Sequence, residues 1–350
     1  MPLKVISASE VRSSIQGNGP LEFDDYIIEG ELDLSDLEIK GISHFNNTVF
    51  QDKANFGFTK FKGDAFFISS NFKEDADFSW SSFNGDADFR GAQFGGDAYF
   101  RNARFDQITD FKWSRFKSLA CFEGASFIGL ALFDGSHFAD AFFDDVSFRD
   151  LLSLHETKYN KFYVRWYDID NHLAFDETAY LLLIENLKNL GLSKDADSCY
   201  YRYRVEQLFH LNYVKNPTGY EFGLFSWLFL GFNIRPEYII MSSFCFIIFF
   251  GIFWKVVDIR APENQIDEYS LEYYSKVSKK TTLLEAFNYS AIVFFSGYGV
   301  KFLTQHIIEP PIMPKRSEIL VKYTFILERV LGGFFTFIFA QSASKLLTGI

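Results

Sequence analysis

The chain has 350 residues, 45 of them Phe, and a formal net charge of −11 at pH 7. A chain of this length holds two or three structural units, because about 100–200 residues per domain is usual. The acidic balance argues against a nucleic-acid partner, since phosphate binding needs clustered Lys and Arg.

Residues 1–27 are expected to form an N-terminal cap. Met1 to Gly19 contain no apolar core followed by small residues, so this stretch has no features of a secretory signal. A domain that begins without such a signal is expected in the cytoplasm.

A regular phenylalanine repeat follows, from Ser43 to Phe148. Phe recurs in steps of five and six residues, and Ser, Thr or Ala stands two residues before each Phe, with Val146 as the exception. The Phe positions are 45, 50, 56, 61, 67, 72, 78, 83, 89, 94, 100, 105, 111, 116, 122, 127, 133, 138, 143 and 148. Neither a strand period of 2 nor a helix period of 3.6 gives this spacing.

The spacing fits a square coil in which each short side sends one large and one small residue inward. Phe fills the centre and stacks on the Phe of the next coil, while Ala or Ser fits where the wall is narrow. Coils of about 22 residues at the ~4.8 Å strand spacing predict about five coils, a rod on the order of 24 Å long.

The repeat unit Gly-Asp-Ala-Asp-Phe at residues 85–89 resembles the pentapeptide-repeat family in its Phe-centred variant. The resemblance covers roughly residues 28–148 and implies a right-handed quadrilateral β-helix, a solenoid that we expect over residues 28–150, but it says almost nothing about function. Some relatives are acidic rods that imitate DNA and bind topoisomerases. Residues 43–150 carry 16 Asp and Glu against 11 Lys and Arg, a mild excess that we interpret as a solvated surface.

Residues 151–216 lack the Phe repeat, and helical spacing there predicts an αα-hairpin connector. Asp176 opens its first helix, Gly191 ends it, and Ser193 opens the second. Residues 195–204 resemble the helices that join pentapeptide repeats to membrane pores in some prokaryotic channel-like proteins. Their Tyr-Arg cluster is either a phospholipid or partner contact or, in the simpler interpretation, core packing with solvated arginines.

The C-terminal third predicts a membrane domain. Residues 217–237 are expected to form an interfacial helix in contact with lipid, because their apolar stretch, residues 222–234, is too short to cross a bilayer. Residues 238–257 and 319–347 are long enough to span. We therefore expect a two-span protein of the cell membrane. Because the N-terminal domain has no signal sequence, both termini are expected in the cytoplasm.

Residues 281–300 between the spans predict a pore helix and a filter-like loop. Thr282 and Glu285 form a capping box, and the apolar helix behind it is too short to span. The helix leads into Gly297, Tyr298 and Gly299. Irregular backbone at membrane depth is tolerated where it lines a water-filled path, and glycines let carbonyls face a dehydrated cation.

This order of span, pore helix, Gly-Tyr-Gly and span resembles the two-transmembrane potassium-channel pore over residues 236–347. The resemblance implies a homotetramer, with Phe295, Ser296, Gly297, Tyr298 and Gly299 as pore residues. Phe295-Ser296 stands where potassium filters have Thr-Val, and Val300 replaces the filter aspartate. A monovalent cation, K⁺ or Na⁺, is therefore expected to permeate, with the selectivity left open.

Four residues of the second span are further candidates. Gly332 and Gly333 permit close packing or a hinge. Charges at this depth usually face the protein interior, so Glu328 either braces the back of the filter or pairs with an Arg from a neighbour. The simpler alternative is an interfacial ion pair of Glu328 and Arg329.

No catalytic or metal-binding set is found: the His residues lie apart, and the chain has no P-loop. Cys121, Cys199 and Cys245 are expected to be reduced, buried thiols. We therefore expect no enzyme activity and no cofactor. The first functional hypothesis is a homotetrameric cation channel. The alternative is a non-conducting membrane-anchored scaffold whose solenoid recruits a cytoplasmic protein partner, and a third, DNA mimicry, treats the helices as an anchor.

Overall fold

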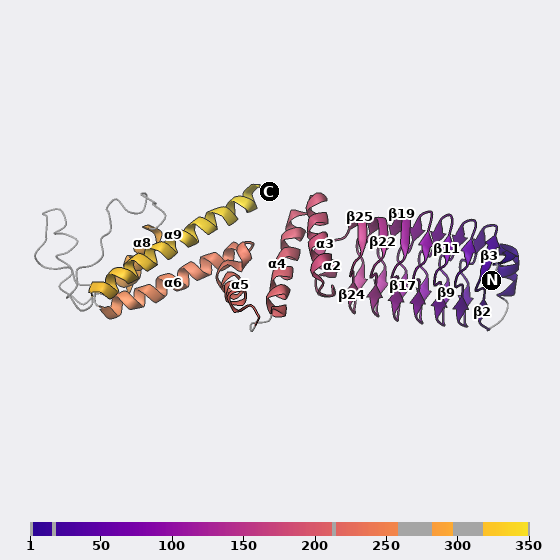
Figure 1. Cartoon of the computed structure of the whole chain (residues 1–350), viewed down its shortest axis with the longest axis horizontal. Coiled ribbons are helices and arrows are strands. Elements are labelled where there is room, and N and C mark those ends of the chain that lie inside the picture. Colours follow the sequence, from indigo (N-terminus) through magenta and orange to yellow (C-terminus); the bar gives the residue numbers. More distant parts are fainter. Residues whose placement is uncertain (1–2, 16–18, 212–214, 258–281, 297–317, 349–350) are drawn as a thin grey trace, which may run out of the picture. The chain divides into compact units, whose positions relative to one another are not determined.

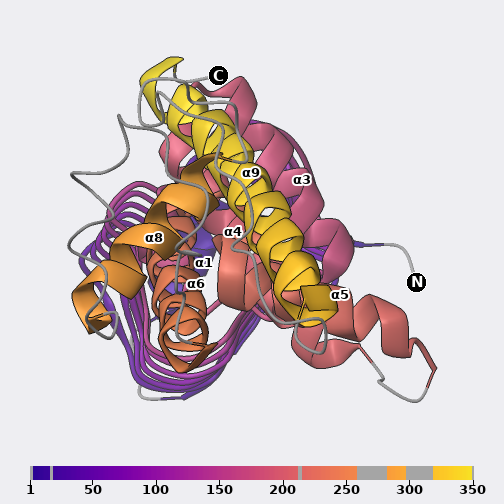
Figure 2. The same ribbon diagram turned by 90° about the vertical axis from the view of Figure 1, so that its left-hand side faces the viewer.

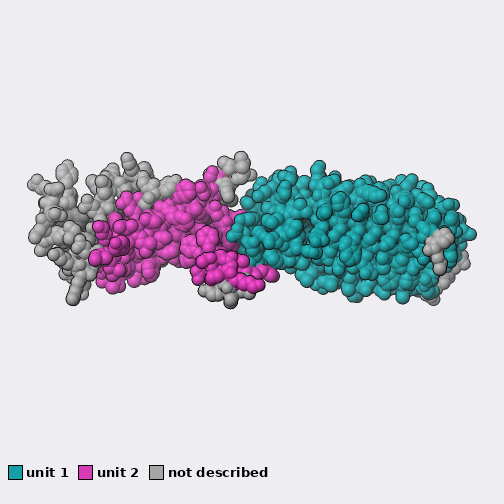
Figure 3. Space-filling model, viewed as in Figure 1, with its two compact units in different colours: residues 1–207 teal, residues 208–350 magenta. Residues whose placement is uncertain are grey.

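The computed structural model describes residues 3–15, 19–211, 215–257, 282–296 and 318–348 (Figure 1). The chain forms two compact units, Met1–Gln207 and Leu208–Ile350, shown in different colours in Figure 3.

Unit 1 is a β-solenoid in which each short strand pairs in parallel with the strand one coil further along, as Ala65 pairs with Ala87. One face carries seven strands, which define about seven coils. These strands are β2 (Leu21–Glu22), β6 (Ser43–His44), β10 (Ala65–Phe66), β14 (Ala87–Asp88), β18 (Thr109–Asp110), β21 (Ala131–Leu132) and β24 (Leu152–Ser153). A second face carries β5 (Glu38–Ile39), β9 (Lys60–Phe61), β13 (Ser82–Phe83), β17 (Arg104–Phe105), β20 (Ser126–Phe127) and β23 (Ser147–Phe148).

The two remaining faces merge into one sheet of twelve strands. One face has β1 (Lys4–Ser7), β3 (Tyr26–Glu29), β7 (Val49–Phe50), β11 (Asn71–Phe72) and β15 (Gln93–Phe94). The other has β4 (Leu32–Asp33), β8 (Ala54–Asn55), β12 (Ala76–Asp77) and β16 (Ala98–Tyr99). The faces join because the last three coils run straight through the corner as the longer strands β19 (Arg115–Cys121), β22 (His137–Phe142) and β25 (Lys158–Tyr163).

The repeated Phe form four stacks along the solenoid axis. Rings one coil apart lie 4.4–5.2 Å from centroid to centroid between Phe45 and Phe148. Rings of neighbouring stacks meet edge to face, as Phe67 and Phe78 do at 5.5 Å and 85°. The small residues two positions earlier, such as Ala65, are fully buried beside them. Aromatic rings prefer these offset and edge-to-face contacts, so the Phe repeat itself stabilises the coil.

Side-chain ladders hold the turns of the coil together. Asp64 Oδ1 accepts from the backbone N–H of Asp86 at 2.9 Å, and Asp86 Oδ1 accepts from that of Ile108 at 3.2 Å. Gly85 is needed at this corner because a Cβ there would overlap Asp64. Left-handed φ angles recur every eleven residues or so at the corners, at positions 25, 36, 47, 58, 69, 80, 91, 102, 113, 124, 135, 145 and 156.

The predicted boundaries of the solenoid are wrong at both ends, and its length is about seven coils instead of five. β2 begins at Leu21, inside the predicted cap of residues 1–27, and β24 and β25 lie inside the predicted helical connector of residues 151–216. The end coils have other apolar residues at the inward positions, among them Ile28, Leu34, Ile39 and Leu154. A pattern of Phe alone therefore misses them.

Helices cover both ends of the solenoid. α1 (Ala8–Ser14) lies at the first coil, and α2 (Trp166–Ile169), α3 (Glu177–Asn189) and α4 (Ser193–His210) follow the last. Asn186 of α3 pairs with the backbone of Phe162 in β25, accepting at 3.1 Å and donating at 2.7 Å. This pairing covers an edge strand that would otherwise present free backbone groups. As predicted, Asp176 caps α3, and Gly191 ends it at φ +75°.

An acidic pair in unit 1 makes its stability depend on pH. Burial, and then the charge of Asp145, raise the pKa of Asp168 in α2 to about 6, and Asp168 Oδ2 is buried without a hydrogen-bond partner in the described structure. Because the carboxyl pKa is raised in the folded state, the protonated form of Asp168 stabilises unit 1. This contribution is fully present below about pH 4 and is lost as the pH rises through about 6.

Asp168→Asn is therefore expected to stabilise unit 1 at pH 8, by on the order of 1 kcal/mol after solvent screening, and to have no effect near pH 4. Thermal unfolding of the full-length protein in detergent, followed by circular dichroism between pH 4 and 8, measures the difference. Asp150→Asn removes the same charge from an exposed site and serves as the control. A pH-independent gain for Asp168→Asn would contradict the titration of this group.

Unit 2 is helical: α5 (Pro217–Leu230), a 3-10 turn η1 (Gly231–Asn233), α6 (Pro236–Val257), α8 (Leu283–Ser296) and α9 (Glu318–Thr348). The predicted interfacial helix of residues 217–237 is shorter than expected, because it ends at Gly231 with φ +52° and α6 already begins at Pro236. Two helices are long and apolar enough to cross a membrane, Pro236–Val257 and Ile319–Ser344. Cys121 and Cys199 are buried as expected, but Cys245 on α6 is exposed, which corrects that prediction.

Candidate pore site

The short helix α8 packs against both long helices of unit 2, and α6 and α9 also contact each other (Figure 2). With 14 residues it is ~21 Å long at 1.5 Å per residue, too short for a ~30 Å bilayer core. Its N-terminus has the reciprocal bonds of a capping box: Thr282 N–H donates to Glu285 Oε2 at 2.7 Å, and Glu285 N–H donates to Thr282 Oγ1 at 3.3 Å. Its start is thus set by its own sequence.

A buried polar network joins all three helices. The indole N–H of Trp254 on α6 donates to Glu328 Oε2 on α9 at 2.7 Å. The hydroxyl of Ser290 on α8 is hydrogen-bonded to Glu328 Oε1 and lies 2.9 Å from the Ile247 carbonyl oxygen. Trp254, Ser290 and Glu328 have no exposed surface. A buried carboxylate is tolerated only when it is hydrogen-bonded, so Glu328 fixes the position of α8 between the long helices.

The hydrogen bonds of the network also show how far α8 extends along α6. Ile247 lies near the middle of α6, and Ser290 bonds to its carbonyl, so α8 passes the midpoint of the long helix before it ends. Nearer the start of α8, Tyr289 packs on Trp254 at 5.4 Å, and nearer its end Phe294 packs on Phe335 at 6.4 Å. The helix therefore runs antiparallel to α6 and parallel to α9.

Gly332 allows the end of α8 to lie directly on α9. A Cβ atom at Gly332 would overlap the backbone carbonyl of Phe294, so no other residue fits without moving one helix. Gly251 has a similar role on α6, where a Cβ would overlap the ring of Phe287. Gly333 is half-buried. Close packing at Gly332 agrees with one of the two roles predicted for the glycine pair.

The predicted filter is only partly within the described structure. Ser296 is buried and donates to the Val293 carbonyl at 2.7 Å, and Phe295 is half-buried beside Phe294, with ring centroids 5.6 Å apart. Phe294 itself is fully buried within the unit. Gly297, Tyr298 and Gly299 lie outside the described residues. The described part of the site therefore consists of the short helix α8, which ends at Ser296, directly before the predicted loop.

Glu328 and Arg329 have opposite environments. Glu328 is fully buried, whereas Arg329 is exposed on the surface of unit 2. No carboxylate of the described segments lies within ion-pair distance of Arg329, so the alternative of an ion pair between these neighbours is not found there. Arg329 lies ten residues beyond Ile319, which is ~15 Å into a candidate span. A charge at this depth is costly in lipid and marks a site that water or protein covers.

Two members of the network, Trp254 and Ser290, were not identified from the sequence. Trp254 stands at the end of an apolar run, where it is typical of a membrane interface, and Ser290 is a small polar residue in an apolar helix. The feature of the sequence that would have indicated them is Glu328, a charged residue within an apolar helix. Glu328 needs donors, and these are two polar side chains of the neighbouring apolar segments.

The fold and the site together define a pentapeptide-repeat solenoid followed by a helical unit with two candidate membrane helices. Three overlapping stretches, residues 45–93, 67–113 and 89–137, match the family model described as pentapeptide repeats (9 copies). The solenoid is therefore a Phe-rich member of that repeat family. No curated protein and no solved structure matches the chain.

Proposed function

We propose that the protein is a homotetrameric cation channel with a potassium-channel-like pore and a cytoplasmic pentapeptide-repeat domain. The observation that carries the proposal is the position of α8, a capped helix too short to span that lies between two apolar helices and ends beyond the midpoint of α6. Backbone that leaves a helix at this depth is tolerated only where it lines a water-filled cavity or is buried in protein. Carbonyl oxygens from Ser296 to Gly299 would replace the water shell of the ion.

Two features support assembly into a tetramer. One pore loop supplies only a quarter of a filter, so four copies must meet on an axis. The outer face of unit 2 also carries a charge at a depth where lipid would surround it, because Arg329 is exposed about halfway along a candidate span. Contact with another copy or with a water-filled path would remove this cost.

The proposed topology is two spans in the cell membrane with both termini cytoplasmic. Residues 217–237 would then lie in the cytoplasmic interface, in contact with lipid, and transmit load from the solenoid to the first span. The permeant ion is monovalent, K⁺ or Na⁺, and serves as substrate without any resident cofactor. We propose that the protein has no catalytic activity.

Currents from the purified full-length protein in planar bilayers test the proposal. We expect unitary cation currents from verified tetramers, and we expect Gly297→Ala and Gly299→Ala to abolish them, because a Cβ would restrict the carbonyl conformations of the filter. Gly19→Ala is the matched control, since a Cβ there meets no atom within 4 Å. A reversal potential that follows chloride, or a monomeric protein in detergent, would overturn the channel.

The alternative function is a membrane-anchored scaffold without conduction, and one surface feature favours it. Phe58 and Trp80 are 54% and 56% exposed, stack at 6.0 Å, and both adopt left-handed φ angles. The left-handed angles belong to the repeating corner of the coil, and the exposed stacked rings on it are typical of a contact surface for a protein partner. Absence of current from verified tetramers in potassium, sodium and mixed solutions would favour this function.

A further inference from the structure

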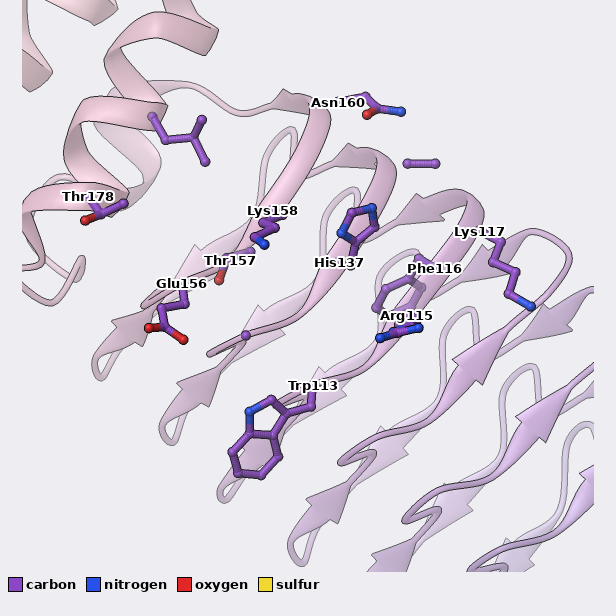
Figure 4. A pocket seen from close by; sticks show the side chains of 13 residues that line it. Trp113, Arg115, Phe116, Lys117, His137, Glu156, Thr157, Lys158, Asn160 and Thr178 are labelled. Carbon is purple, nitrogen blue, oxygen red and sulfur yellow. The ribbon is translucent and has the colours of Figure 1, made fainter.

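Unit 1 contains a polar groove that the proposed pore does not use (Figure 4). Its floor is the three long strands β19, β22 and β25, and Thr178 and Leu182 of α3 form one wall. Its volume is about 1190 Å³, large enough for a ligand of nucleotide size.

Basic side chains line the floor of the groove in a row. Arg115, His137 and Lys158 are direct partners on the three adjacent strands, so they stand ~4.8 Å apart along the row. Lys117 adds a fourth basic side chain two residues beyond Arg115. Glu156 is the acid among the lining residues. The two permanent cations Arg115 and Lys158 flank His137, so the row gathers positive charge on one stretch of the sheet.

The row is unusual for this protein, whose net charge is −11. Five other cations on the coils have an acidic partner, namely Lys53 with Asp75, Arg90 with Asp88, Arg101 with Glu123, Arg104 with Asp106 and Lys112 with Asp134. In the part of the chain that the structure describes, neither Arg115, Lys117 nor Lys158 lies within ion-pair distance of a carboxylate. Their charge is available to an anion from solution.

An aromatic ring stands at the rim of the same groove. Trp113 is 63% exposed, and its φ of +59° is unfavourable for a bulky residue. Gly135, one coil further on, makes room for the indole, because a Cβ there would lie 2.7 Å from Trp113 Cδ1. The left-handed φ belongs to the repeating corner of the coil, and the exposed indole at this corner stands beside the unpaired basic side chains.

We propose that this groove binds a nucleoside polyphosphate. The phosphate chain would lie along Arg115, His137 and Lys158, because charge-assisted hydrogen bonds to phosphate are stronger than those between neutral groups. The base would stack on Trp113. Asn160 and Thr178 add polar groups at the edges of the groove. The site is complete within unit 1, so binding does not depend on conduction by the pore.

Isothermal titration calorimetry of the full-length protein in detergent, with magnesium-free ATP at low salt, tests the proposal. The double variant Arg115→Gln/Lys158→Gln is expected to weaken ATP binding at least tenfold. Lys60→Gln/Lys62→Gln removes two exposed charges from another face and is expected to leave binding unchanged. Raising the salt concentration is expected to weaken wild-type binding, because the contacts are charged.

Tripolyphosphate represents the phosphate part of the ligand and adenosine the nucleoside part, so their binding tests the two parts separately. We expect Trp113→Ala to weaken ATP about tenfold and to leave tripolyphosphate unaffected, as a stacking contact requires. Equal loss in the two double variants, or no ATP binding at 1 mM, would overturn the site. Tripolyphosphate binding as tight as that of ATP would overturn the nucleoside part of the proposal. Normal thermal unfolding of each variant shows that the loss is not due to misfolding.

Discussion

Glu328→Ala is expected to destabilise unit 2 by at least about 2 kcal/mol, since each buried polar group left without a partner costs about 1–3 kcal/mol. The substitution removes the acceptor of the Trp254 indole N–H and one partner of the Ser290 hydroxyl, both fully buried. It also leaves a cavity between α6, α8 and α9. Thermal unfolding of the purified protein in detergent measures the loss.

Glu328→Gln is the matched control, because an amide of the same shape satisfies the network. Its oxygen accepts from Trp254, its NH₂ donates to Ser290 Oγ, and the hydroxyl hydrogen of Ser290 remains for the Ile247 carbonyl. We therefore expect the Gln variant to unfold close to the wild type. A Gln variant as unstable as the Ala variant would mean that the charge, and not the hydrogen bonding, holds the helices together.

Phe67→Ala is expected to destabilise the solenoid by about 3–5 kcal/mol, the usual cost of removing a buried Phe from a core. Phe67 is fully buried and stacks on Phe45 at 5.2 Å and on Phe89 at 4.9 Å. It also meets Phe56 edge to face at 5.6 Å. One substitution therefore interrupts a stack and its cross-contacts in the same coil. Faster hydrogen exchange of the amides in β6, β10 and β14 of the full-length protein reports this loss.

The neighbouring residue supplies the control. Phe66, the last residue of β10 and the direct neighbour of Phe67 in the chain, points outward, is half-buried, and has His44 as its stacked neighbour at 5.3 Å. Phe66→Ala is expected to cost less than about 1 kcal/mol, as surface substitutions usually do. Similar exchange rates in the two variants would show that the central Phe stacks do not carry the stability of the coil.

The solenoid was largely predictable because its core residue is a single type at a fixed spacing. Each inward position between Phe45 and Phe148 holds a Phe, so period and face could be read directly. The end coils use Leu, Ile and other apolar residues at the same inward positions, and a repeat defined by Phe does not reach them. The straight strands β19, β22 and β25 could not be predicted either, because nothing in the Phe spacing of the coil at 116–122 distinguishes it from earlier coils.

The sequence by itself determined the Phe-filled coil, the capped short helix at Thr282 and the two long apolar helices, because each depends on contacts close in sequence or on a regular repeat. Only the tertiary structure decided which side chains meet Glu328, since its partners Ser290 and Trp254 are 38 and 74 residues away. The same holds for the row of Arg115, His137 and Lys158, three basic residues that are ordinary surface residues in the sequence and become one site when the coils stack.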